Sequence, residues 1–326
     1  MPQSRFSPCF QPLPVLVGIL LLSWVLNPLG DVSAQTPPAD QASIEQSRLY
    51  INRPDLRPDP DTSLYTTEAA PATEGDPDLG AQQILKRKDD YDPFLVTASS
   101  QAIYTDNVAL VKKGRQDDTY LVNGVAAQWK PKITNELYGI MGVKQTFYRY
   151  LVFDALDFDS LDAGAGMQYY WKDLGGISTT ARYNYNRLTR ATLDKEFFRN
   201  HQFILDLDKS FALSRNLFTF VNAEATFSLS DPYEAQRWDY ALLGGIFGHI
   251  TRRWDAQLTY RIALYDYFAP GRDDLNQSVG LSTGYNFTDW IGVGASANFT
   301  FNNSTQPVFD YDSVNAGGGV YLNVKF

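Results

Sequence analysis

The feature that most constrains this sequence is an alternation of apolar and polar residues that recurs throughout positions 93–326. Leu258 and Tyr260, for example, share one face of an extended chain, while Thr259 and Arg261 share the other. Successive side chains of a β-strand point to opposite faces, so this period of two predicts strands that separate an apolar from a polar environment. About twelve such runs follow one another along the chain.

The breaks between these runs alternate between two kinds. Short breaks begin near positions 130, 172, 213, 251 and 288. Longer, Asp-rich breaks cover positions 105–118, 151–157, 191–200, 231–237, 269–274 and 302–311. Tight turns at one end and longer loops at the other are typical of an up-and-down outer-membrane barrel, with turns in the periplasm and loops outside. An even number of strands places both ends of the barrel on the periplasmic side.

Aromatic residues cluster beside the short breaks, where a membrane barrel would meet the inner interface. They are Trp129, Trp171, Phe211, Trp254, Phe287 and Trp290. Amphipathic rings are favoured at membrane interfaces. A soluble β-sandwich also alternates, but it needs neither aromatic residues at each turn nor so continuously apolar an outer face. The sequence therefore predicts an all-β fold, a transmembrane antiparallel barrel of about twelve strands over 93–326.

The N-terminal residues predict export from the cytoplasm. Arg5 precedes an apolar run over 13–26, and small residues follow up to Ala34. This pattern predicts a signal peptide, 1–34, cleaved between Ala34 and Gln35. A membrane anchor is the alternative, but the run is shorter than the roughly 20 residues that a spanning helix needs.

The next segment, 35–92, is rich in Pro, Asp, Thr and Ala and shows neither the helical nor the strand period. It is predicted to be a disordered periplasmic segment, and its insertion into the barrel as a plug is compatible with this composition. The lone cysteine, Cys9, lies in the predicted signal peptide, so the mature chain would have no disulfide or Cys-based metal site. No cofactor is expected, and a net charge of -9 argues against a nucleic-acid partner.

The polar faces of the strands predict a hydrated lumen lined by Gly, Ser, Asn and Gln. Five charged residues near mid-strand are candidates for a constriction: Lys144, Arg182, Asp206, Glu224 and Arg261. Their mixed charges predict weak ion selectivity. In the alternative, opposite charges pair across a barrel of this size and inward rings such as Tyr170 and Phe220 fill it.

Two resemblances to known sequences extend this interpretation. The final run, "VYLNVKF", resembles the signal by which outer-membrane barrels reach their insertion machinery, through Val320, Leu322, Val324 and Phe326. The stretches "YTDNVAL", "GRQDDTYLVNGVAAQW", "YRY" with its acidic loop, and "LDAGAGMQYYW" resemble porin-like β-barrel proteins associated with exopolysaccharide loci in Gram-negative bacteria. No catalytic motif comes with that family, so the resemblance implies a pore or an export accessory in the outer membrane.

The function that the sequence favours is passive diffusion of small polar solutes, with saccharides as candidates. The alternative is a closed barrel that acts as an accessory or scaffold in exopolysaccharide export or envelope architecture. No enzyme is predicted, because neither His201 nor His249 has a serine nucleophile placed beside it. Acidic loops could bridge lipopolysaccharide phosphates through divalent cations, but solvated turn residues explain them more simply, so no metal site is predicted. Expected partners are outer-membrane lipid and lipopolysaccharide, the barrel-insertion machinery, small polar solutes and polysaccharide-export components.

Overall fold

The computed structural model describes residues 92–191, 195–214, 216–269 and 271–326. The predicted signal peptide, its cleavage site at Ala34 and Gln35, and the predicted periplasmic segment up to residue 91 lie outside the described residues.

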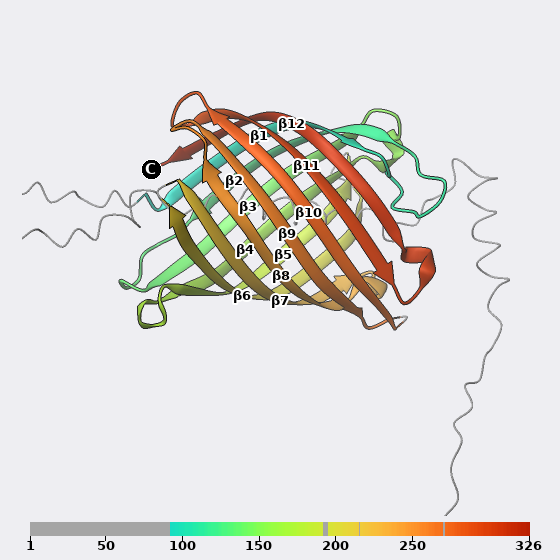
Figure 1. Ribbon diagram of the computed structural model, residues 1–326. Coiled ribbons are helices and arrows are strands. Elements are labelled where there is room, and N and C mark those ends of the chain that lie inside the picture. The colour runs from blue at the N-terminus through green and yellow to red at the C-terminus, as the bar shows by residue number, and fades with distance from the viewer. Residues whose placement is uncertain (1–91, 192–194, 215, 270) are drawn as a thin grey trace, which may run out of the picture. The chain divides into compact units, whose positions relative to one another are not determined.

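Within the described residues, twelve antiparallel strands form one closed barrel in which each strand pairs with its neighbours in sequence and β12 pairs with β1 (Figure 1). This confirms the predicted fold and strand number. The strands are β1 (Phe94–Thr105), β2 (Asp118–Trp129), β3 (Leu137–Tyr150), β4 (Phe158–Trp171), β5 (Ile177–Arg190), β6 (Glu196–Ser214), β7 (Leu217–Asp231), β8 (Arg237–His249), β9 (Trp254–Tyr267), β10 (Arg272–Asn286), β11 (Ile291–Ser304) and β12 (Tyr311–Lys325).

The end of the barrel where β1 begins and β12 ends, which we call the turn end, carries the connections 130–136, 172–176, 215–216, 250–253 and 287–290. The other end, the loop end, carries 106–117, 151–157, 191–195, 232–236, 268–271 and 305–310. The predicted contrast in length is found only for 106–117, because the other loop-end connections are about as short as those of the turn end. Strands β6 and β10 begin inside the predicted loops 191–200 and 269–274, so these two loops are shorter than expected.

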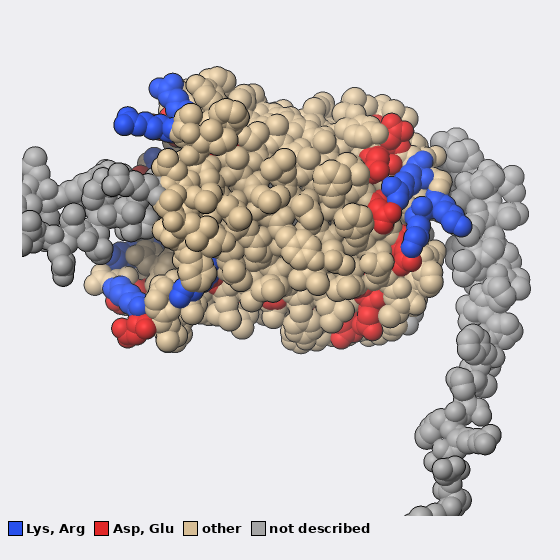
Figure 2. Space-filling model, in the orientation of Figure 1, with Lys and Arg blue, Asp and Glu red and all other residues tan. Residues whose placement is uncertain are grey.

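The outer surface of the barrel is an apolar belt. Leu258 and Tyr260 are 49% and 46% exposed, whereas their neighbours Thr259 and Arg261 point inward and are 3% and 8% exposed. Figure 2 shows acidic and basic side chains gathered mostly at the two ends, with a wide uncharged surface between them. The helices in the described residues are three-residue 3-10 turns, and none is long or apolar enough to cross a membrane.

The aromatic residues predicted at the short turns all point outward at the turn end. Their exposed fractions lie between 40% and 51% for Trp129, Trp171, Phe211, Trp254, Phe287 and Trp290. The indole N–H groups of two of them donate hydrogen bonds to threonines of the next strand, Trp171 to Thr179 at 2.8 Å and Trp254 to Thr283 at 2.6 Å. These rings therefore combine an apolar body with a satisfied polar edge, which suits a membrane interface.

The seam between β1 and β12 closes the barrel. Its ladder runs from Leu95, opposite Lys325, to Thr105, opposite Asn315. At the turn end, the backbone N–H groups of Phe94 and Phe326 donate to each other's carbonyl oxygens, at 3.0 and 3.1 Å, and their rings stack at 5.5 Å. The final strand is therefore fully paired, as predicted.

The loop end of the seam is fastened by side chains as well as by backbone. The N–H of Val314 donates to the Asp106 carboxylate at 2.7 Å, and the N–H of Asp106 donates to the Val314 carbonyl at 3.1 Å. Arg115 then forms ion pairs with both Asp106 and Asp312. The seam thus has additional contacts at both ends of its ladder.

Replacing Phe326 with serine tests the expected assembly signal. The backbone bonds to Phe94 remain, so the folded barrel should lose only the stacking contribution, about 1 kcal/mol. Assembly in cells should fall more steeply, as measured by the fraction of heat-modifiable protein in membranes. Phe287→Ser, which removes another exposed ring beside a tight turn, is the matched control. Equal assembly of the two variants would contradict a special role for the last residue.

Candidate functional site

The interior of the barrel is polar along most of each strand. On β11, Ser296, Asn298 and Thr300 face inward, while Ala297 and Phe299 face outward. The inward Asn298 and Thr300 are 3% and 1% exposed, and outward Phe299 is 45% exposed. The alternation used to assign the two faces is therefore confirmed, and the lumen is lined mainly by hydroxyl, amide and glycine positions.

A cavity of about 640 Å³ lies in the turn-end half of this lumen. Inward glycines and small polar residues leave the space, as expected from their size. Its wall includes Thr97, Ser99, Gln101, Gly124, Gly142, Lys144, Asp162, Gly164, Gln168, Tyr170, Ser178, Arg182, Asn184, Gln257, Ser282, Gly294, Ser296, Gly319 and Tyr321. The lining supplies many hydrogen-bond donors and acceptors together with a few rings.

The ring of Tyr321 lies against the wall of this cavity. A Cβ atom at Gly292 would overlap the ring, and one at Gly294 would come within 3.6 Å of it. The Tyr321 hydroxyl donates to the Asn286 side-chain oxygen at 2.7 Å, which fixes the ring in this position. Glycine on β11 thus provides the recess that keeps a large inward ring out of the centre of the lumen.

His249 lies at the turn end of the same wall. Its Nδ1 hydrogen-bonds with the Asp255 carboxylate, whose other oxygen accepts a 3.5 Å contact from the Asn286 amide. The Phe247 ring meets the imidazole edge-on at 4.8 Å. These contacts hold the imidazole of His249 between Asp255 and Phe247.

Charged residues gather midway along the lumen, on the wall formed by β5 to β9. Arg182 Nε lies 3.3 Å from Asp206 Oδ2, and Arg182 Nη2 lies 3.9 Å from Glu224 Oε2. Asp206 and Glu224 are directly opposite each other across β6 and β7, so the guanidinium lies beside two facing carboxylates. Arg261 attracts Glu224 and donates a 2.9 Å hydrogen bond to the Tyr265 hydroxyl.

The five candidate constriction residues therefore divide into two groups. Arg182, Asp206, Glu224 and Arg261 form the network just described, with contacts between nearby strands of one wall. Lys144 lies on β3, where it faces Asp162 of β4 across the ladder, and both residues line the cavity. The charges pair along the wall, which differs from the across-lumen pairing considered for a closed barrel.

The facing wall, β11, β12 and β1, is electrically neutral at these levels. Among the described inward positions of 97–105, 292–302 and 311–323, no side chain carries a charge. The lumen is therefore polarised from side to side, with ionic groups on one wall and hydroxyl and amide groups on the other.

The loop-end half of the lumen contains rings and arginines. A cluster of inward apolar residues, here called the mouth cluster, comprises Ile103, Val108, Tyr120, Val122, Tyr148, Tyr150, Phe158, Leu188 and Phe198. On the β8 to β10 side, the Arg272 guanidinium lies 3.8 Å from the ring centroids of both Tyr267 and Phe309, and Arg237 lies 4.3 Å from that of Tyr265.

Sequence analysis did not single out Arg237 and Arg272. Both were assigned to loops, because charged residues beside Asp and Pro are typical of turns. Each in fact pairs with an aspartate on its own strand, Arg237 with Asp239 at 2.6 Å and Arg272 with Asp274 at 2.9 Å. Continuing the alternation of inward and outward residues a few positions beyond the expected ends of these strands would have placed both arginines on the inward face.

His201 faces outward, on the apolar side of β6 that also carries Phe203 and Leu205. Its Nδ1 hydrogen-bonds with the Tyr183 hydroxyl at 2.7 Å, and the Tyr185 ring lies 5.2 Å away. Across the described ranges, no group of three or more His, Cys, Asp or Glu residues is arranged to hold a metal ion.

No family model matches the chain, and no curated protein matches it. Solved structures similar to it include an outer membrane channel from Pseudomonas putida F1, at 12% identity over 73% of this chain and 99% of that chain, with a TM-score of 0.49. A bacterial polysaccharide outer membrane secretin is 11% identical over 73% of this chain and 100% of that chain, with a TM-score of 0.42. A KdgM porin in complex with disordered oligogalacturonate is 11% identical over 69% of this chain and 98% of that chain, with a TM-score of 0.39. Identities and TM-scores of this size do not carry a function from one chain to another.

Proposed function

We propose that the protein is an outer-membrane channel for passive diffusion of small polar solutes, with saccharides among them. The observation that carries this proposal is the combination of an apolar belt outside with a polar cavity of about 640 Å³ inside a closed barrel. In a bilayer, such a barrel pairs every backbone group and leaves a polar path through the hydrocarbon region. The solute gradient supplies the driving force.

The two ends of the barrel support an orientation in the membrane. The outward aromatic rings at the turn end suit the inner interface, so the short turns and both ends of the barrel would face the periplasm. The loop end would then face outside, among the headgroups of lipopolysaccharide. Lipid, lipopolysaccharide and the barrel-insertion machinery are accordingly the partners that we propose.

The neutral wall supports saccharides as a solute class. Hydroxyl and amide groups such as Ser296, Asn298 and Gln101 can exchange hydrogen bonds with sugar hydroxyls in place of water. The facing wall carries fixed charges. A neutral solute can pass them without losing an ionic hydration shell, because it carries no charge itself. A cavity lined by many polar side chains also favours a channel over a closed accessory barrel. No catalytic role is proposed, since within the described residues the hydrogen bonds of His201 and His249 go to Tyr183 and Asp255 and not to a serine.

Single-channel recording in planar bilayers tests this proposal. The purified protein should give stable conductance steps, with selectivity shifted towards anions by Glu224→Gln and towards cations by Arg261→Gln. A unit charge about 5 Å from a passing ion contributes about 0.8 kcal/mol in water, so each permeability ratio should change roughly fourfold.

Matched controls are Glu234→Gln and Arg252→Gln, which make the same substitutions at exposed positions outside the strands. Both control variants should leave ion selectivity unchanged. Swelling of liposomes in a solution of neutral disaccharide measures sugar uptake for every variant. A correctly folded barrel that neither conducts nor admits sugar would overturn the proposed function.

A further inference from the structure

The connection between β1 and β2, loop 106–117, turns inward at its start. Asn107, Val108 and Leu110 are 0%, 1% and 8% exposed, although they follow directly after the end of β1 at the loop end. An ordinary surface loop keeps such backbone in water, where its polar groups are easily satisfied. This loop instead places its first residues inside the barrel mouth.

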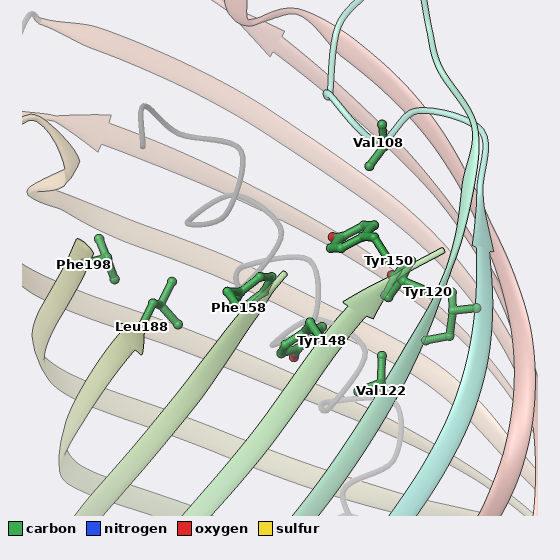
Figure 3. Packing of buried hydrophobic residues seen from close by; sticks show 9 residues of the cluster. Val108, Tyr120, Val122, Tyr148, Tyr150, Phe158, Leu188 and Phe198 are labelled. Atoms are coloured by element: carbon green, nitrogen blue, oxygen red, sulfur yellow. The ribbon is translucent and has the colours of Figure 1, made fainter. Parts of the chain in front are cut away.

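Val108 is the apolar anchor of the loop. It belongs to the mouth cluster, whose other members all come from inward positions of β1 to β6. Figure 3 shows its side chain held by the loop above the rings of Tyr150 and Tyr120, which stack on each other at 5.0 Å. Burial of an apolar side chain away from water is favourable, so this contact favours the inward position of the loop.

The side chain of Asn107 forms hydrogen bonds with backbone groups that the inward turn of the loop would otherwise leave without partners. Its Nδ2 donates to the carbonyl oxygens of Val111, at 2.7 Å, and of Asp312, at 2.8 Å, and its Oδ1 accepts from the Val111 N–H at 3.0 Å. Leu110 adopts a left-handed φ of 51° beside the Tyr311 ring. The inward turn is therefore built from specific bonds to both the loop itself and β12.

The outer part of the loop is attached more weakly. Lys112 pairs with Asp310 at 3.2 Å, and Arg115 pairs with Asp312 and Asp106. Exposed ion pairs of this kind contribute little to stability, because water screens them. The Ser304 N–H, followed by Lys112, holds the pKa of Asp310 below its ordinary value, so this carboxylate keeps its charge in mildly acidic water. The buried residues Asn107 and Val108 therefore hold the loop in place more than the exposed ion pairs of Lys112 and Arg115 do.

We infer that loop 106–117 narrows the loop-end mouth, and that Val108 and Asn107 set the largest solute able to pass. This inference rests on the proposed channel function. The start of the loop lies above Tyr120 of β2 and Tyr150 of β3, so solutes would enter along the remaining part of the mouth. Removal of the loop should widen the entrance while leaving the inward side chains of the neutral wall and the charged network below unchanged.

The test compares the complete protein with two variants in planar bilayers and in liposomes. In one, a two-residue Asn-Gly turn replaces positions 106–117; Thr105 and Asp118 already face each other in the ladder, so such a turn can join them. In the other, Val108→Asp puts a charge into the mouth cluster and should expel the loop. Each should raise single-channel conductance roughly twofold and admit a linear tetrasaccharide that the unmodified protein excludes.

Gln116→Asp is the matched control, because it adds the same charge at an exposed position of the same loop. It should leave conductance and the size limit unchanged. If the unmodified protein conducts and the loop-replaced barrel shows the same conductance and size limit, the inference is wrong while the channel function stands. A silent unmodified protein would instead reject the channel function. The loop replacement decides the matter even if Val108→Asp fails to fold, which heat-modifiable migration would reveal.

Discussion

Gly319→Val should prevent the barrel from closing. Gly319 faces inward on β12, opposite Gln101 of β1, and a Cβ atom there would lie 2.6 Å from the Gln101 Cα and would overlap the Ser100 carbonyl oxygen. These are backbone atoms of the partner strand, so they can move only if the ladder separates. The cost should reach about 3 kcal/mol or more, and little folded protein should accumulate.

The measurement is the fraction of heat-modifiable, protease-resistant barrel after refolding and in membranes. Ala316→Val supplies the control, because this residue lies on the same strand but points outward and is exposed. It should fold normally and gain slightly in β-propensity. A normally folded Gly319→Val protein would show that β12 and β1 are further apart in solution than this geometry requires.

Arg182→Met should cause the second large loss. Without the guanidinium, Asp206 and Glu224 remain directly opposite each other, and their side chains are only 1% and 8% exposed. Removing one partner of a buried ion pair typically costs about 3–5 kcal/mol, because the other charge stays buried without compensation. Arg182 is itself 27% exposed, so we expect a loss near the lower end, about 3 kcal/mol, in denaturant unfolding monitored in lipid or detergent.

A double variant separates charge repulsion from lost packing. Adding Asp206→Asn to Arg182→Met removes one of the two facing carboxylates while keeping the shape of the side chain. Most of the lost unfolding free energy should then return. If the double variant is no more stable than Arg182→Met alone, the aliphatic part of the arginine matters more than its charge, and the electrostatic account of this wall is wrong.

Much of the architecture was predictable because lipid imposes a strict period. Residues such as Leu258 and Arg261 differ so strongly in polarity that a shift of one position would place a charge in the hydrocarbon region. The rings that flank the short breaks then identified the turn end. The same logic oriented Arg182, Asp206, Glu224 and Arg261 towards the lumen.

Other features could not follow from alternation. The period gives the face of a residue but not its neighbours, which depend on register across strands that lie far apart in the sequence. The network around Arg182 arises because Asp206 and Glu224 are in register on β6 and β7. The inward turn of loop 106–117 depends on Val108 meeting rings of β2 to β4, whereas the surrounding Lys, Gly and Asp residues are typical of an exposed loop.

The additional contacts at both ends of the β1–β12 seam, around Phe94 and around Asp106, bear on how the barrel is assembled. The strands that meet there are separated by more than two hundred positions, from Thr105 to Asn315 at the nearest point of the ladder, while every other ladder joins consecutive strands. Hairpins can therefore accumulate early, but the sheet keeps two open edges until the final strand arrives. Closure should be the last and slowest step of biogenesis, and the contacts around Phe94 and Asp106 should act after it, by slowing reopening. Changes at those contacts are expected to shorten the lifetime of the finished barrel more than they delay its formation.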